Sequence, residues 1–142
     1  MFSANAENMD DQTSINACNR ALQNGDYLKA ISLSNQVIQK DKNNQEAYLC
    51  KGRALGQNGQ FNESIESLTL AEKLSKTPRE HMIALTLMGN VYRNQKHFED
   101  AIKSYNQSIE FAKSDNDKRF ESIEFIAKFD NIVSAINAQE NL

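Results

Sequence analysis

The sequence predicts an all-α protein built as an array of antiparallel helix pairs, and three observations lead to this fold class. The 142 residues include only five Gly and one Pro, which leaves little material for the turns of a sheet protein. A heptapeptide occurs three times, as "GDYLKAI" at 25–31, "GQFNESI" at 59–65 and "KHFEDAI" at 96–102. Its aromatic residue repeats at intervals of 34 and then 37 residues, a period typical of two-helix units, at Tyr27, Phe61 and Phe98.

Small residues occupy fixed places on both sides of each heptapeptide turn. Three residues after the aromatic, a small residue precedes an isoleucine each time, at Ala30, Ser64 and Ala101. Before the turn, a second column of small residues holds Cys18, Gly52 and Gly89. A small residue beside a large one lets two helices approach closely, so the columns predict packed helix pairs.

Start and stop signals predict seven helices, near 13–24, 28–40, 45–58, 61–75, 78–95, 98–113 and 117–139. The acidic stretches "MDDQ" and "SDNDK" precede the first and last helices, where carboxylates and amides cap free N–H groups. Each turn heptapeptide starts a second helix of a pair. In "TPRE", Thr77 is the expected N-cap, Pro78 the first helical residue and Glu80 the capping-box partner, which starts the fifth helix about one turn early. Residues 1–10 are expected to form a flexible tail and 11–142 a single domain.

The last helix carries two apolar faces. At 100° per residue, one stripe about 120° wide is expected to cover the third helix pair, and it contains Phe125, Ile126, Phe129, Ile132, Val133 and Ile136. A second face at the start of the helix holds Phe120, Ile123 and Ala127. The favoured interpretation is that the preceding helix or loop covers this second face; the alternative is a partner site or a homodimer contact.

These columns resemble the tetratricopeptide-repeat (TPR) family over about residues 13–113. Tyr48 matches the early aromatic of that repeat, Gly52 and Gly89 its glycine, and Ala71 its late alanine. Val37 and Ser108 replace that alanine, and Lys42 stands where a proline is expected. The resemblance implies a right-handed superhelical array (an α-solenoid), with units at about 11–44, 45–78 and 79–115 and a capping helix at about 117–139.

Composition argues against several classes of function. The net charge of −3 and the pI of about 5.4 give no basic surface for a nucleic acid. Without a signal sequence or a run of 18 apolar residues, we expect no membrane insertion and a cytoplasmic location. Cys18 and Cys50 lie 32 residues apart and fit no zinc motif, so we expect two reduced thiols.

Nothing in the sequence predicts catalysis. Neither His81 nor His97 has an evident carboxylate or nucleophile partner, and no glycine-rich loop is present to hold a phosphate. We therefore expect no catalytic residue, no cofactor, no metal site and no enzymatic activity. A protein or peptide is the expected partner.

The TPR resemblance implies that the first helices of the units line a concave groove for an extended peptide or a partner's helix. The corresponding residues form an amide-rich set with two arginines: Ile15, Asn16, Asn19, Gln23, Leu49, Cys50, Arg53, Gln57, Thr86, Leu87, Asn90, Arg93 and Asn94. Asn costs roughly 0.5–0.7 kcal/mol in a helix relative to Ala, so Asn19 and Asn90 in one column with Arg53 suggest hydrogen bonds to a ligand. The alternative is composition alone, since Asn is 17 of the 142 residues.

The carboxylate clamp by which some TPR proteins hold chaperone tails uses lysines, an arginine and asparagines. The matching positions here are Ile15, Asn19, Cys50, Ile83 and Leu87, of which only Asn19 is retained. Apolar side chains supply no charged donors, so this ligand class is disfavoured. We expect a non-catalytic peptide-binding adaptor or chaperone, and the alternative is a structural scaffold that self-assembles through the last helix.

Overall fold

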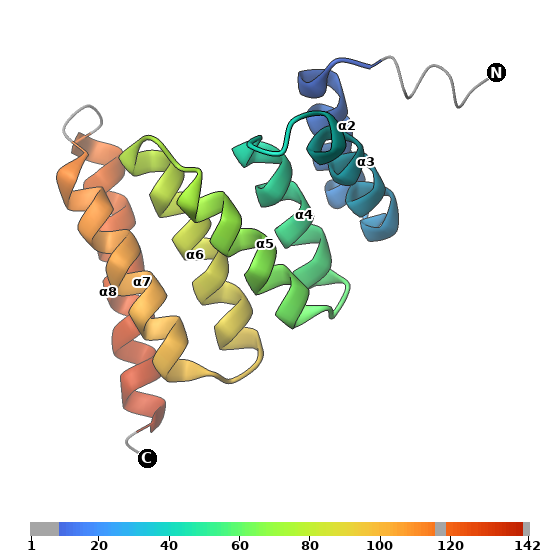
Figure 1. The fold of residues 1–142 in the computed structure, drawn as a ribbon. Coiled ribbons are helices and arrows are strands. Elements are labelled where there is room, and N and C mark those ends of the chain that lie inside the picture. The colour runs from blue at the N-terminus through green and yellow to red at the C-terminus, as the bar shows by residue number, and fades with distance from the viewer. Residues whose placement is uncertain (1–8, 116–118, 141–142) are drawn as a thin grey trace. The chain divides into compact units, whose positions relative to one another are not determined.

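The computed structural model describes residues 9–115 and 119–140, with the side chains of 119–126 and 140 left out. This part of the chain contains seven α-helices and no strand (Figure 1). The helices are α2 (Asp11–Gln23), α3 (Tyr27–Lys40), α4 (Gln45–Gln57), α5 (Phe61–Lys73), α6 (Pro78–Asn94), α7 (Phe98–Ser114) and α8 (Arg119–Glu140). Every end lies within two residues of its predicted place, because capping and turn residues mark the ends locally.

The chain divides into two compact units, Met1–Leu74 and Ser75–Leu142, which we call the N-terminal and C-terminal units. In the N-terminal unit α2 packs on α3, α3 on α4 and α4 on α5, and α2 also contacts α4. In the C-terminal unit α6 packs on α7, and α7 on α8. The single domain over 11–142 and its three repeat borders stay predictions.

The three heptapeptides form the same turn. The second residue before each aromatic has a left-handed backbone, with φ of 76° at Gly25, 82° at Gly59 and 63° at Lys96. The residue after it donates its N–H to a carbonyl five positions earlier, over 2.8 Å at Asp26, 2.9 Å at Gln60 and 2.9 Å at His97. This bond is the one that closes a Schellman motif, so each heptapeptide ends one helix and starts its antiparallel neighbour.

We expect Lys96→Gly to raise the free energy of unfolding by about 0.5–1 kcal/mol. A left-handed backbone costs a residue with a Cβ atom about 1–2 kcal/mol, and glycine avoids that cost while adding some freedom to the unfolded chain. Urea denaturation measures the change. Lys103→Gly, at an exposed site inside α7, is the matched control and should destabilise by about 0.5–1 kcal/mol. Equal losses in both variants would contradict the turn assignment.

The column of small residues on the first helices permits close approach of the second helices. A Cβ atom added at Gly52 would lie 2.6 Å from Leu68 Cγ, and one at Gly89 would lie 2.6 Å from Tyr105 Cε1. Each glycine therefore faces a large, fully buried side chain. The predicted small partners Ala30, Ser64 and Ala101 are also fully buried, which confirms the packing role of both columns.

Side chains cap the starts of α2 and α6 at the residues that the sequence predicts. Asp10 Oδ1 accepts from the N–H of Thr13 over 2.7 Å, and this backbone hydrogen bond lowers the pKa of the Asp10 carboxyl. Thr77 Oγ1 accepts from the N–H of Glu80 over 3.2 Å. The return bond of the capping box differs from the expected one, because Glu80 Oε2 accepts from the N–H of Lys76 rather than from Thr77. The stretch "SDNDK" lies largely outside the described residues.

Helix α8 covers α7 with the predicted apolar stripe. Phe129 and Ile136 are buried, and Ile132 and Val133 are partly buried against the same cluster, which includes Ala101, Tyr105 and Ile109 of α7. The rings of Phe129 and Tyr105 have their centroids 5.3 Å apart. These four residues confirm the covering role of the stripe, while the side chains of Phe125 and Ile126 are outside the described set.

The prediction of two reduced thiols is wrong. Cys18 on α2 and Cys50 on α4 form a disulfide, with their Cα atoms 6.5 Å apart, and both are buried. Their spacing of 32 residues is close to one repeat, and successive first helices pack side by side, so the two side chains meet in the core. Neither the zinc-motif spacing nor the composition carries that information.

Candidate binding site

On α2 and α4, most of the predicted groove residues are accessible. Asn16, Gln23, Arg53 and Gln57 are exposed, and Asn19 and Leu49 are half-buried. Two residues correct the prediction, since only 3% of Ile15 and 1% of Cys50 is exposed. Ile15 packs with Val37 and Ala47 in the core, and Cys50 is bonded to Cys18. Neither offers its side chain to a ligand.

Polar contacts orient part of this α2–α4 surface. Gln12 Nε2 donates to Asn16 Oδ1 over 3.1 Å, and the Tyr27 hydroxyl donates to Gln57 Oε1 over 3.4 Å. Both contacts occupy amide oxygens, so the amide N–H groups of Asn16 and Gln57 remain as donors. With the Arg53 guanidinium, the surface is richer in donors than in acceptors.

On α6, the predicted groove residues divide into two sets. Arg93 and Asn94 are exposed, and Leu87 is half-buried. Thr86 instead engages α7, because its Oγ1 lies 2.9 Å from Ser108 Oγ. Asn90 also reaches α7, since its Oδ1 accepts from the Tyr105 hydroxyl over 2.5 Å. The Asn90 side chain, which the sequence assigns to ligand binding, therefore also contacts the buried Tyr105.

The α6 surface includes one residue that the groove prediction omitted. Ile83 is 42% exposed and lies one turn before Leu87 on the same helix. The sequence places Ile83 only among the five positions that match the carboxylate clamp. Its spacing of four residues from Leu87 was the available signal, because such residues share a helix face.

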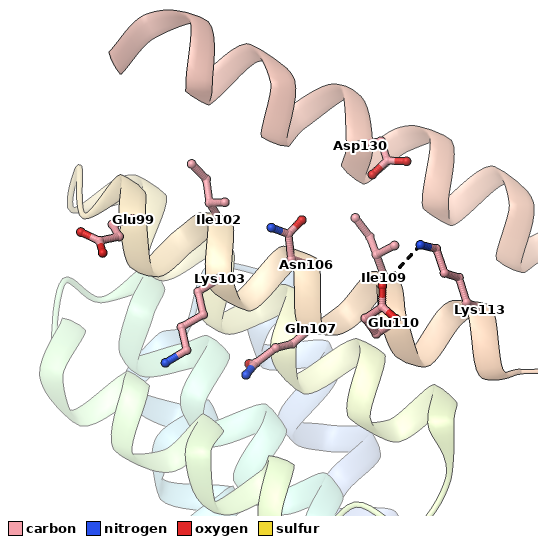
Figure 2. A pocket seen from close by; sticks show the side chains of 9 residues that line it. All are labelled: Glu99, Ile102, Lys103, Asn106, Gln107, Ile109, Glu110, Lys113 and Asp130. Atoms are coloured by element: carbon pink, nitrogen blue, oxygen red, sulfur yellow. Dashed lines mark hydrogen bonds and ion pairs between the residues drawn. The ribbon is translucent and has the colours of Figure 1, made fainter. Parts of the chain in front are cut away.

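A pocket of about 660 Å³ lies between α7 and α8, and the sequence did not predict it. Figure 2 shows Ile102, Asn106 and Ile109 projecting from α7 toward α8, with Asp130 opposite. The other lining residues include side chains of both charges, among them the Lys113–Glu110 pair, whose Nζ and Oε1 atoms lie 3.3 Å apart. Of the predicted partner or dimer face, Ala127 is exposed. The side chains of Phe120 and Ile123 lie outside the described residues.

Both histidines have packing contacts. The His81 ring stacks on Phe111 with centroids 4.3 Å apart, and His97 lies 6.5 Å from the Tyr92 ring. Burial raises the pKa of the Tyr92 hydroxyl, and the charge of Asp100 adds to the effect.

Among the residues the structure describes, there is no cluster of three or more metal-ligating side chains. None of the described helices is long and apolar enough to cross a membrane.

Comparison of the sequence with known protein families finds one match. The sequence model of the family described as "Psidin, N-terminal TPR repeats region" matches residues 15–129. No curated protein matches the sequence.

Solved structures with the same fold include peptide complexes. PcrH in complex with the chaperone binding region of PopD is 12% identical, with a TM-score of 0.76 over 94% of this chain and 97% of that chain. The Yersinia enterocolitica type III secretion chaperone SycD in complex with a peptide of the translocator YopD is 15% identical, with a TM-score of 0.74 over 91% and 93%. The first TPR domain of human RPAP3 is 18% identical, with a TM-score of 0.68 over 90% and 95%. These likenesses confirm the predicted all-α, TPR-like fold class.

Proposed function

Because the chain belongs to the TPR family of the Psidin N-terminal repeat region, we propose that it is a non-catalytic protein–protein interaction module that binds an extended peptide segment. The observation that carries the proposal is that the first helices of each unit present accessible, donor-rich side chains, on α2 with α4 in the N-terminal unit and on α6 in the C-terminal unit. Solved structures of the same fold that contain a bound peptide support it.

The side chains on these helices suit recognition of a peptide backbone. An extended peptide has free N–H and C=O groups, and an amide side chain such as that of Asn19 offers both a donor and an acceptor. Arg53 and Arg93 favour an acidic residue in the ligand. Leu87 and Ile83 on α6 and Leu49 on α4 add apolar contacts. We therefore propose a ligand that contains both acidic and apolar residues.

The affinity of such a ligand is expected to be micromolar. A short surface buries little area, and a flexible peptide loses conformational freedom when it becomes ordered. Selection of random 12-residue peptides displayed on phage against the immobilised chain, followed by calorimetric titration of the enriched peptides, measures both sequence preference and affinity. Failure to enrich any peptide would contradict the proposed function.

We expect Asn19→Ala combined with Arg53→Ala to weaken binding of an enriched peptide at least tenfold, about 1.4 kcal/mol. Asn90 is kept unchanged in this test because its amide also holds the Tyr105 hydroxyl. The matched control is Asn62→Ala combined with Lys29→Ala, at exposed sites on the second helices. Equal affinity of the two double variants would move the binding surface away from α2 and α4.

The cytoplasmic location stays a prediction. The Cys18–Cys50 disulfide counts against it, since disulfide bonds persist mainly in oxidising compartments.

A further inference from the structure

Tyr105 of α7 is held in one place by its surroundings. The side chain is fully buried, its ring lies 5.3 Å from that of Phe129, and Gly89 of α6 leaves the space that the ring occupies. A ring packed on both sides fixes the position of its hydroxyl. That hydroxyl donates to Oδ1 of Asn90, the residue after Gly89 on α6.

This hydrogen bond decides what Asn90 offers to a ligand. An Asn side chain has one acceptor oxygen and one amide nitrogen with two N–H groups. The Tyr105 hydroxyl holds the oxygen of the Asn90 amide, so the amide nitrogen lies on the opposite side of Cγ, away from that hydroxyl. No described residue accepts a hydrogen bond from this nitrogen. Asn90 thereby acts as a fixed donor.

Arg93 adds a positive charge beside this donor. It lies three residues after Asn90, so the two side chains are neighbours on the surface of α6. Its charge also reaches the Tyr105 hydroxyl, where it lowers the pKa against the larger upward effect of burial. The C-terminal end of a helix usually repels anions through its free carbonyls. Here the carbonyls of Val91, Tyr92 and Arg93 each accept an N–H from the following turn.

We propose that Asn90 and Arg93 form a site for the side-chain carboxylate of an Asp or Glu in the peptide, with Tyr105 as the positioning residue behind Asn90. Two neighbouring donors, one of them charged, match the two oxygens of a carboxylate. Leu87 and Ile83 lie one and two turns earlier on α6, so they receive an apolar residue next to the acidic one. This inference rests on the proposed peptide-binding function and names the ligand group that α6 recognises.

The first test compares the affinities of wild type for two peptides that differ only in one acidic side chain. The probes are the tightest acidic peptide from the phage selection and its counterpart with Gln for Glu or Asn for Asp, both amidated at the C-terminus. Wild type should bind the acidic peptide at least tenfold more tightly than its counterpart. Enriched peptides without Asp or Glu, or equal affinities, would overturn the inference. Loss of binding caused only by the amidation would assign the site to a chain end and would also overturn it.

Two variants test whether Tyr105 orients Asn90 for the ligand or only stabilises the fold. Asn90→Asp keeps an oxygen for the Tyr105 hydroxyl but removes the donors, so the preference for the acidic peptide should disappear. Tyr105→Phe keeps the buried ring and frees Asn90, so the preference should fall about threefold or more while affinity for the neutral peptide stays the same. Circular dichroism checks that both variants are folded. A preference that persists in Asn90→Asp would contradict the role of the amide.

A second test needs no peptide. Titration with sodium acetate, compared with sodium chloride, should shift the side-chain amide signals of Asn90 in the NMR spectrum of wild type more than in that of Tyr105→Phe. Such a shift without any enriched peptide would keep the carboxylate site and reject the proposed function. Enriched peptides without an acetate shift or an acidic preference would keep the function and reject the site.

Discussion

Replacing Phe129 with Asp is expected to lower the free energy of unfolding by about 4–8 kcal/mol. Phe129 is 5% exposed and lies in the cluster that joins α8 to α7, beside the Tyr105 ring. Truncating a buried Phe costs about 3–5 kcal/mol, and placing a polar group without a partner in the vacated space adds about 1–3 kcal/mol. The loss should be large because Phe129 is, with Ile136, one of the described α8 side chains that are buried against α7.

Urea denaturation monitored by circular dichroism gives the change in free energy. Asn131→Asp is the matched control, because it adds the same charge to α8 at an exposed position and should change stability by no more than about 0.5 kcal/mol. A melting temperature of Phe129→Asp equal to that of the control would show that α8 does not bury its apolar stripe.

Replacing Gly89 with Ala is expected to lower the free energy of unfolding by up to about 2 kcal/mol, although alanine is the better helix former. The new Cβ atom would lie 2.6 Å from Cε1 and 2.7 Å from Cδ1 of Tyr105. These atoms belong to a rigid, fully buried ring, so relief requires a shift of α6 or α7. Overpacking of this kind costs about 1–3 kcal/mol, and the gain of about 1 kcal/mol in helix propensity offsets part of that cost.

A double-mutant cycle separates the steric effect from helix propensity. Tyr105→Val removes the ring atoms that the new Cβ would meet and keeps part of the apolar volume. In that background Gly89→Ala should become neutral or stabilising by up to about 1 kcal/mol, measured by urea denaturation. The same destabilisation in both backgrounds would exclude the contact with Tyr105 as its cause.

The Tyr105 side chain takes part both in the proposed carboxylate site and in the packing that these stability predictions address. Gly89 admits the Tyr105 ring, and the ring brings its hydroxyl to Asn90. A change at Gly89 or at Phe129 should therefore alter ligand preference as well as stability, because the Tyr105 ring packs against both residues.

The sequence by itself determined the helices, the turns between them and the small-residue columns. These features depend on residues within about five positions of each other, such as Gly25 and Gly59 at the left-handed turn residues and Thr77 at the start of α6. The repetition of the heptapeptide then identified which helices pair, since a repeated unit buries its apolar face against its neighbour. The stripe on α8 was predictable for the same reason, because its spacing follows the helical period.

Only the tertiary structure decided which side chains on these helices remain accessible. Asn16 and Cys50 share a column of the repeat, yet Asn16 is exposed and Cys50 is 1% exposed. The difference arises because α4 packs against α2, α3 and α5, whereas the main described neighbours of α2 are α3 and α4.

The disulfide and the Tyr105–Asn90 hydrogen bond also lay beyond sequence reasoning. Each joins residues on different helices, 32 and 15 positions apart, and each depends on how closely those helices approach. Helical periodicity specifies the direction of a side chain on its own helix to within part of a turn. The distance to an atom on another helix is set by the volumes of all the side chains packed between them, and that sum is known only once the helices are together.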